Sequence, residues 1–191
     1  MKSYAKKIFA ILLTLPMLFL SSCGIFNVEN HGLENFSVND ESGSLCSYII
    51  PEGFIDMFPY ESGDYHYSSE CVTLGIAVCD RAILYFNYDD ETYLQAKEYA
   101  MEHLDLSSET VASYNNYSFY NNDTPANNGV SHLSSEEYPY DFVRFAYNDE
   151  KKCLIFLGFS VSMELYDEVD GVSSDWGVFL DKYFSEYYDF S

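Results

Sequence analysis

The sequence predicts an α+β domain, built as an antiparallel sheet with flanking helices. Three observations lead to this class. Short β-rich runs alternate with turn residues between positions 45 and 161. Two segments have the apolar spacing of amphipathic helices, one after the first predicted hairpin and one near the end of the chain. The resulting order of strands, hairpin, helix, strands, hairpin and helix is typical of α+β folds.

The domain is expected to open with a strand at residues 45–50, which ends at the turn residues Pro51 and Gly53. A polar, Asn-rich stretch without sustained period, residues 23–43, precedes it and is typical of a flexible tether. We therefore expect a single folded domain over residues 44–191.

A hairpin is predicted next. Residues 71–79 alternate bulky and small side chains, as one strand would. Asp80-Arg81 then separates this strand from a second β-rich run at residues 82–88, which predicts the turn. A further strand is expected at residues 113–120.

A second hairpin is predicted from strands at residues 141–147 and 152–161. The second of these is apolar on both faces, which favours a central position in the sheet. Before this hairpin, residues 121–134 are rich in Asn, Ser, Pro and Gly and predict a long loop. Loops of this length are usually functional or mobile.

Two amphipathic helices are predicted. The first covers residues 90–104 with Asp90 as its N-cap, and the second opens at Ser173, Ser174 or Asp175. The apolar stripe of the second helix consists of Trp176, Phe179, Leu180, Tyr183, Phe184 and Tyr187. Such a continuous stripe must be covered, so we expect this helix to pack on the sheet.

Three of the first seven residues are lysines, and a short, largely apolar segment follows at residues 8–20. This segment is too short for a membrane helix, which needs about 20 apolar residues. It closes on Leu-Ser-Ser-Cys at residues 20–23, which resembles the lipobox of bacterial lipoproteins. The resemblance implies a signal peptide at residues 1–22, a lipidated Cys23, and a membrane-anchored position on the extracytoplasmic side of the cell envelope.

The opening strand ends in the turn Ile50-Pro51-Glu52-Gly53-Phe54, and the final helix contains an aromatic run at residues 179–184. Together with the order of elements, these features resemble the PsbP-like family of α/β/α sandwiches over residues 45–190. The resemblance implies a non-catalytic module that docks on protein partners. A cystatin-like or NTF2-like α+β sheet is the alternative fold.

Acidic residues greatly outnumber basic ones, with 31 Asp and Glu against 9 Lys and Arg and a formal net charge of −22. Because phosphate binding depends on clustered Lys and Arg, this composition excludes nucleic acid as a partner. The basic residues of the mature chain, Arg81 and Arg144 among them, are scattered between carboxylates. The charge either keeps the protein soluble or favours a partner with a basic face.

No motif for catalysis, metal binding or cofactor binding is found, so we expect none of the three. The acidic residues 167–171 fail the calcium-loop pattern and are interpreted as a loop. The four histidines share no ligand spacing, and Ser160 lacks the second glycine of a nucleophile elbow. A hydrolase that uses paired carboxylates is the alternative.

Four cysteines besides Cys23 are compatible with either free thiols or disulfides, because exported proteins can form both. They are Cys46, Cys71, Cys79 and Cys153. Cys71 and Cys79 are not expected to pair, because a shared strand would hold them roughly 26 Å apart, and a bridge needs about 7 Å or less.

Tyrosines lie on both sides of the long predicted loop, at Tyr117, Tyr120, Tyr138 and Tyr140. Tyrosine suits half-buried strand faces and is also enriched at interfaces. We expect these four residues to contact a partner. The predicted function is therefore a lipid-anchored binding or accessory module that docks a protein, and a receptor for a small sugar or peptide is the alternative.

Overall fold

The computed structural model describes residues 25–31, 49–51, 53–59, 64–74, 77–124 and 139–191. The strands in these ranges are β1 (Ile25–His31), β2 (Asp64–Leu74), β3 (Ala77–Asn87), β4 (Ala112–Tyr114), β5 (Tyr117–Asn121), β6 (Phe142–Asn148) and β7 (Cys153–Val161). They form one antiparallel sheet in the order β1-β2-β3-β7-β6-β5-β4. The predicted α+β class is confirmed.

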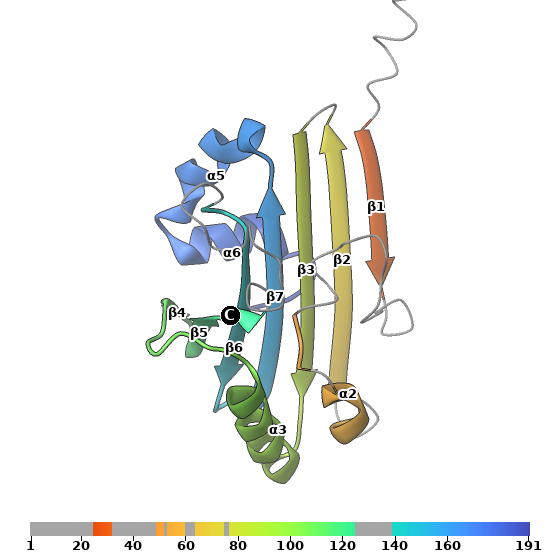
Figure 1. Ribbon diagram of the computed structural model, residues 1–191, viewed down its shortest axis with the longest axis vertical. Coiled ribbons are helices and arrows are strands. Elements are labelled where there is room, and N and C mark those ends of the chain that lie inside the picture. The colour runs from red at the N-terminus through yellow and green to blue at the C-terminus, as the bar shows by residue number, and fades with distance from the viewer. Residues whose placement is uncertain (1–24, 32–48, 52, 60–63, 75–76, 125–138) are drawn as a thin grey trace, which may run out of the picture.

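Helices cover both faces of this sheet (Figure 1). On one side, which we call the α3 face, lie α2 (Phe54–Met57) and α3 (Asp90–His103). On the other, the α6 face, lie α5 (Tyr166–Ser173) and α6 (Trp176–Phe184). A 3-10 turn, η4 (Met163–Leu165), connects β7 to α5. The sheet is therefore the middle of three layers.

The predicted central strand is in the middle of the sheet. Along β7, successive side chains enter opposite hydrophobic clusters: Leu154 and Phe156 pack on the α3 face, whereas Ile155 and Leu157 pack on the α6 face. All four are buried. This explains why the strand is apolar throughout, since a strand covered on both sides has no solvent face.

Both predicted helices form, and each begins at an aspartate that caps it. Asp89 caps α3 by accepting a hydrogen bond from the backbone N–H of Thr92 at 2.8 Å, one residue before the predicted Asp90. Asp175 caps α6 by accepting from the N–H groups of Gly177 and Val178. Each cap satisfies helix N–H groups that have no partner within the helix.

The first hairpin differs from its prediction. β2 ends at Leu74 and β3 begins at Ala77, so the single strand predicted at residues 71–79 is wrong. Asp80 and Arg81, predicted to form the turn, lie inside β3. The continuous β-forming pattern of residues 71–79 concealed the end of β2 at Leu74.

Cys71 and Cys79 consequently lie on neighbouring strands rather than on one. The register pairs Cys71 with Asp80 and Cys79 with Val72, so the two thiols point to opposite faces of the sheet. A disulfide between them is disfavoured for this reason, and not because of a 26 Å separation. Cys79 is a free thiol, and burial raises its pKa to about 11. Cys46 lies outside the described residues.

Part of the expected tether is a strand. Residues 25–31 form β1 at the edge of the sheet and pair with β2 along its whole length. The apolar residues Phe26 and Val28 alternate with polar ones, a period of two that the Asn-rich composition obscures. The ordered domain therefore begins by Ile25, not at residue 44. Most of the strand predicted at 45–50 lies outside the described residues.

Two further segments also differ from expectation. Residues 113–120 form the hairpin β4-β5, because Asn115 and Asn116 adopt positive φ angles of 46° and 65°. Asn tolerates this left-handed conformation, which a two-residue hairpin turn requires. The acidic residues 167–171, predicted as a loop, lie inside α5, where carboxylates in the first turn interact favourably with the helix dipole.

The predicted signal peptide and Cys23 lie outside the described residues. Among the helices of the described ranges, none has the length and apolar character needed to cross a membrane.

Candidate functional site

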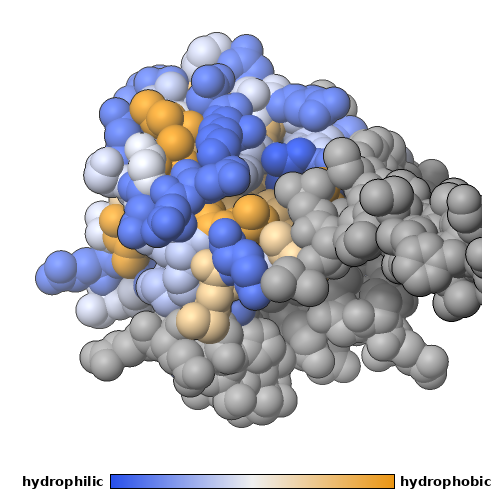
Figure 2. Space-filling view, turned by 90° about the horizontal axis from the view of Figure 1, so that it is seen from above, coloured by the Kyte–Doolittle hydropathy of each residue, from blue (hydrophilic) through white to orange (hydrophobic). Residues whose placement is uncertain are grey.

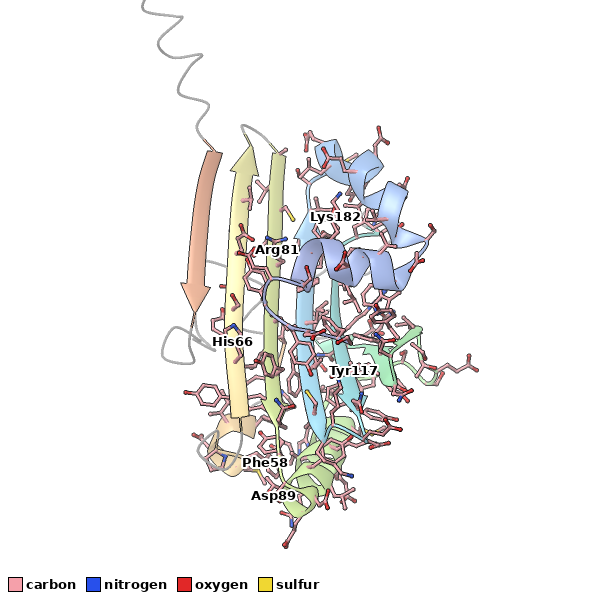
Figure 3. The ribbon with its side chains drawn as sticks, turned by 180° about the vertical axis from the view of Figure 1, so that it is seen from behind. Phe58, His66, Arg81, Asp89, Tyr117 and Lys182 are labelled. Atoms are coloured by element: carbon pink, nitrogen blue, oxygen red, sulfur yellow. The ribbon has the colours of Figure 1, made fainter. Side chains whose placement is uncertain are left out.

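Tyr117, one of the four predicted partner-contacting tyrosines, belongs to the core. It is 0% exposed and lies on the α6 face (Figure 3). Its hydroxyl hydrogen-bonds with that of Tyr188, which also donates to the thiol of Cys153 at 3.3 Å. Burial raises the pKa of Tyr117 to about 12. This side chain is therefore removed from any exposed contact surface.

Tyr120 and Tyr140 are half-buried and lie on different faces of the sheet. Tyr120 stacks on Tyr147 on the α3 face, with ring centroids 5.9 Å apart. Tyr140 packs edge-on against Tyr166 of α5 on the α6 face, at 5.0 Å. Tyr138 lies outside the described residues. Of the three described tyrosines, Tyr117 and Tyr140 thus lie on the α6 face, and Tyr120 lies on the α3 face.

The chain has two arginines, and both lie on the α6 face. Arg81 of β3 forms an ion pair with Glu70 of β2, its cross-strand partner (Figure 3). The hydroxyl of Tyr187 donates to the same carboxylate at 2.7 Å. Burial alone would lower the pKa of Arg81, but the hydrogen bond to Glu70 and the neighbouring Tyr187 raise it overall. The charge of Arg81 is therefore compensated.

Arg144 of β6 contacts no carboxylate within the described part of the chain. Its guanidinium carbon lies 4.0 Å from the ring centroid of Trp176 and 4.4 Å from that of Phe142. Burial lowers the pKa of Arg144 to about 10, and nothing opposes this effect. The side chain stays charged at neutral pH, so the described part of the fold holds a cation against two aromatic rings without an acidic partner.

Polar atoms near Arg144 are unpaired as well. Nε of Arg144, Oδ1 of Asn121 and Nε1 of Trp176 are buried and have no hydrogen-bond partner among the residues that the structure describes. Asn121 of β5 is the cross-strand partner of Arg144, so the two side chains emerge next to each other on the same face. Because buried polar groups are normally paired, several unpaired atoms around one cation call for a functional explanation.

The tip of Arg144 reaches the surface. The residue is only half-buried, and Nε is the one guanidinium nitrogen among the buried atoms that lack a partner. No hydrogen bond joins the two terminal nitrogens to another described residue, and they are not among the fully buried atoms, so we infer that their parallel N–H groups are partly open to one bidentate acceptor. We call Arg144, Trp176, Phe142 and Asn121 the Arg144 site.

Strand alternation and the start of α6 assemble this site. Phe142, Arg144 and Ala146 alternate along β6 and so share the α6 face. Trp176 is the first residue of α6, directly after its cap, and stacks on Phe179 with the ring planes 10° apart. Trp176 is therefore held in place before any ligand arrives.

The sequence assigned these two residues to other roles. Helical spacing places Trp176 in the apolar stripe of the final helix, and Arg144 stands among the scattered basic residues. One signal could have found the site: Arg144 is a charged residue at an inward position of an otherwise apolar strand, Phe142-Val143-Arg144-Phe145-Ala146.

Paired carboxylates, which would indicate a hydrolase, occur on the α3 face. Asp80 is the cross-strand partner of Ser160, whose hydroxyl donates to Asp141 at 2.9 Å. Asp141 is only 4% exposed and also accepts from the N–H of Val161. Burial raises the pKa of Asp80 to about 6. Asp141 thus stabilises the sheet and is out of reach of a substrate.

The described residues contain no group of three His, Cys, Asp or Glu side chains arranged to hold a metal ion. Three of the five unpaired buried side-chain atoms found among the described residues belong to the Arg144 site, and the other two are Nε of Arg81 and Nδ2 of Asn122. Comparison of the chain with models of known protein families, with curated proteins and with solved structures gave no match.

Proposed function

We propose that this protein is a lipid-anchored, extracytoplasmic binding module that docks a protein partner at the Arg144 site. The observation that carries the proposal is the half-buried guanidinium, which contacts no carboxylate among the described residues of a chain with 31 acidic residues. A purely structural arginine would be expected to have an acidic partner, as Arg81 has. Departures from favourable pairing are typical of functional sites.

The anchor rests on the lipobox-like residues 20–23 and the apolar segment before them. Lipid on Cys23 would hold the domain at the outer side of a bacterial membrane. The three layers agree with what the PsbP-like resemblance implies, and they support a docking module without assigning it a partner.

The surface charge supports a partner with a basic face. Exposed carboxylates of α5 are Asp167, Glu168 and Asp170. Figure 2, which views the molecule from this end, shows mainly hydrophilic residues in its described part. With a net charge of −22, the protein would attract basic partners over a distance and speed their encounter.

Capture from native envelope extracts tests this function. The mature protein, its Arg144→Met variant and its Lys182→Met variant would be immobilised and exposed to the same extract. Lys182 is exposed on α6, so its variant has the same change in net charge as Arg144→Met. We expect the wild type and Lys182→Met to retain a partner that Arg144→Met loses, and retention to fall as salt rises. An identical set of captured proteins for all three would contradict docking at the Arg144 site.

A further inference from the structure

We infer that the group recognised at the Arg144 site is a carboxylate carried on a basic peptide segment of the partner. This inference rests on the proposed function, because it names the chemistry of the same docking site. The solvent-facing edge of a guanidinium presents two parallel N–H donors, which match the two oxygens of a carboxylate. Trp176 and Phe142 pack against the guanidinium and so limit the directions from which an acceptor can approach.

A carboxylate fits this site better than a phosphate group. Phosphate recognition gathers several cations, and Arg144 stands alone. Three other cations of the described chain form ion pairs: Arg81 with Glu70, Lys97 with Asp149, and Lys152 with Asp90. The remaining two, Lys151 and Lys182, each donate to a backbone carbonyl. One guanidinium balances the single charge of a carboxylate, whereas a phosphate dianion would remain half-neutralised in a strongly acidic protein.

The acidic surroundings explain why the carboxylate must arrive on a basic segment. A free small anion is repelled by a chain with a net charge of −22, and this repulsion weakens only beyond the screening length of about 8 Å. Basic residues beside the carboxylate turn this long-range repulsion into attraction. The acidic surface would then attract the basic segment over a distance, and Arg144 would select its carboxylate at short range.

Tyr140 provides a second contact for such a segment. It packs against the same hydrophobic cluster as Phe142 and is only half-buried, so the residue remains partly accessible. A peptide that places its carboxylate on Arg144 could extend along β6 towards Tyr140. Tyr117 and Tyr140 both belong to this cluster, and Tyr140 is the one that is partly exposed, whereas Tyr117 is buried.

Trp176 supplies the readout, because it is the single tryptophan of the chain and contacts Arg144 directly. Its fluorescence would be followed while the mature protein is titrated with three short peptides of lysine and glycine. One ends in a free carboxylate, one is amidated, and one is amidated but contains an internal glutamate. Inorganic phosphate would be titrated in parallel.

We expect saturable binding of at least one carboxylate-bearing peptide, about tenfold or more tighter than the amidated peptide. Which of the two binds identifies the source of the carboxylate, as a chain end or a side chain. Arg144→Met should remove the preference, and Arg144→Lys should weaken it, because an ammonium lacks the planar fork. Lys182→Met should keep it.

Equal binding of all three peptides would overturn the inference, as would no binding of either carboxylate-bearing peptide at millimolar concentration. Tighter binding of inorganic phosphate than of the carboxylate-bearing peptides would overturn it in favour of a phosphate ligand. These failures are distinct from failure of the proposed function. If envelope capture depends on Arg144 while the carboxylate-bearing peptides do not bind, docking stands and the carboxylate assignment falls.

Discussion

Arg81 and Arg144 show what a carboxylate partner changes for a half-buried arginine. Both lie on the same face of the same sheet, and both contact aromatic rings. Glu70 and Tyr187 surround the first with hydrogen-bonding groups, whereas aromatic rings are the main contacts of the second. The two residues thus form a natural comparison within one molecule.

Replacing each arginine by methionine should have opposite consequences. Arg81→Met leaves Glu70 buried without its cation, which should lower the free energy of unfolding by about 3–5 kcal/mol. Arg144→Met removes a charge that burial disfavours, so the free energy of unfolding should stay the same or rise by about 1–2 kcal/mol. Urea unfolding at pH 7 measures both. A large loss of stability in Arg144→Met would show that the fold, and not a ligand, requires this guanidinium.

Asp80 should make stability depend on pH. Burial raises its pKa from 3.8 to about 6, so the folded protein holds this proton more tightly than the unfolded chain does. The contribution of Asp80 to the free energy of unfolding is therefore fully present below about pH 4 and is lost as the pH rises through about 6. The loss is on the order of 2–3 kcal/mol. Asp80→Asn should remove this slope and be more stable than wild type at pH 7.

The control for this pH dependence is Glu98→Gln, which removes one negative charge from the exposed side of α3. Unfolding would be measured at several pH values between 4 and 7. If Asp80→Asn and Glu98→Gln change the pH profile equally, the effect comes from net charge and not from burial of Asp80.

At the scale of elements, α6 connects the core to the candidate site. Its buried side consists of Phe179, Leu180 and Phe184, which pack on β7 and β6, and its first residue is Trp176. Any change that loosens α6 should therefore affect both stability and the Arg144 site.

Truncating a buried residue of α6 should be costly. Phe184 is 0% exposed, so Phe184→Ala should lower the free energy of unfolding by about 3–5 kcal/mol through lost burial and a cavity. Val178 lies on the outer side of the same helix and is 48% exposed, so Val178→Ala should change it by less than about 0.5 kcal/mol. Chemical denaturation measures both, and similar values would rule out packing of α6 as described.

The elements that the sequence predicted well have a clear period and a clear cap. The α+β class, the helix at residues 90–104, the final helix and the second hairpin were predicted from such signals. The failures occur where two signals compete. At 71–79 a continuous strand pattern outweighed Gly75, and at 25–31 polar composition outweighed alternation. Strand pairing between distant segments decided both cases, and one sequence does not display it.

The candidate site was less predictable than the fold. Arg144, Trp176 and Asn121 come from three separate elements, and their meeting depends on the β5-β6 register and on where α6 crosses the sheet. The predicted tyrosines flank one loop in the sequence, yet alternation along β5 directs Tyr117 and Tyr120 to opposite faces. Proximity in sequence was a poor guide to a shared surface.

At the scale of the whole molecule, a three-layer domain with a net charge of −22 is combined with a lipobox-like amino end. Cys23→Ala should release the protein from membranes or block its processing, because the thiol that would accept the lipid is gone. Membrane fractionation and intact-mass analysis of wild type and variant measure this. An unmodified Cys23 in the wild-type protein would refute the anchor.

The position of β1 leaves only a short link between such an anchor and the sheet. β1 begins at Ile25, two residues after Cys23, a distance of about 7 Å even when the chain is fully extended. The end of β1 nearest the anchor and the acidic α5 lie at the same end of the molecule (Figure 1). Lipid on Cys23 would thus hold the carboxylates of α5 near the bilayer. Their repulsion from anionic headgroups would then tilt the domain and restrict its movement. A partner would then have to approach along the plane of the membrane, because the short link before β1 limits the distance between the domain and the bilayer.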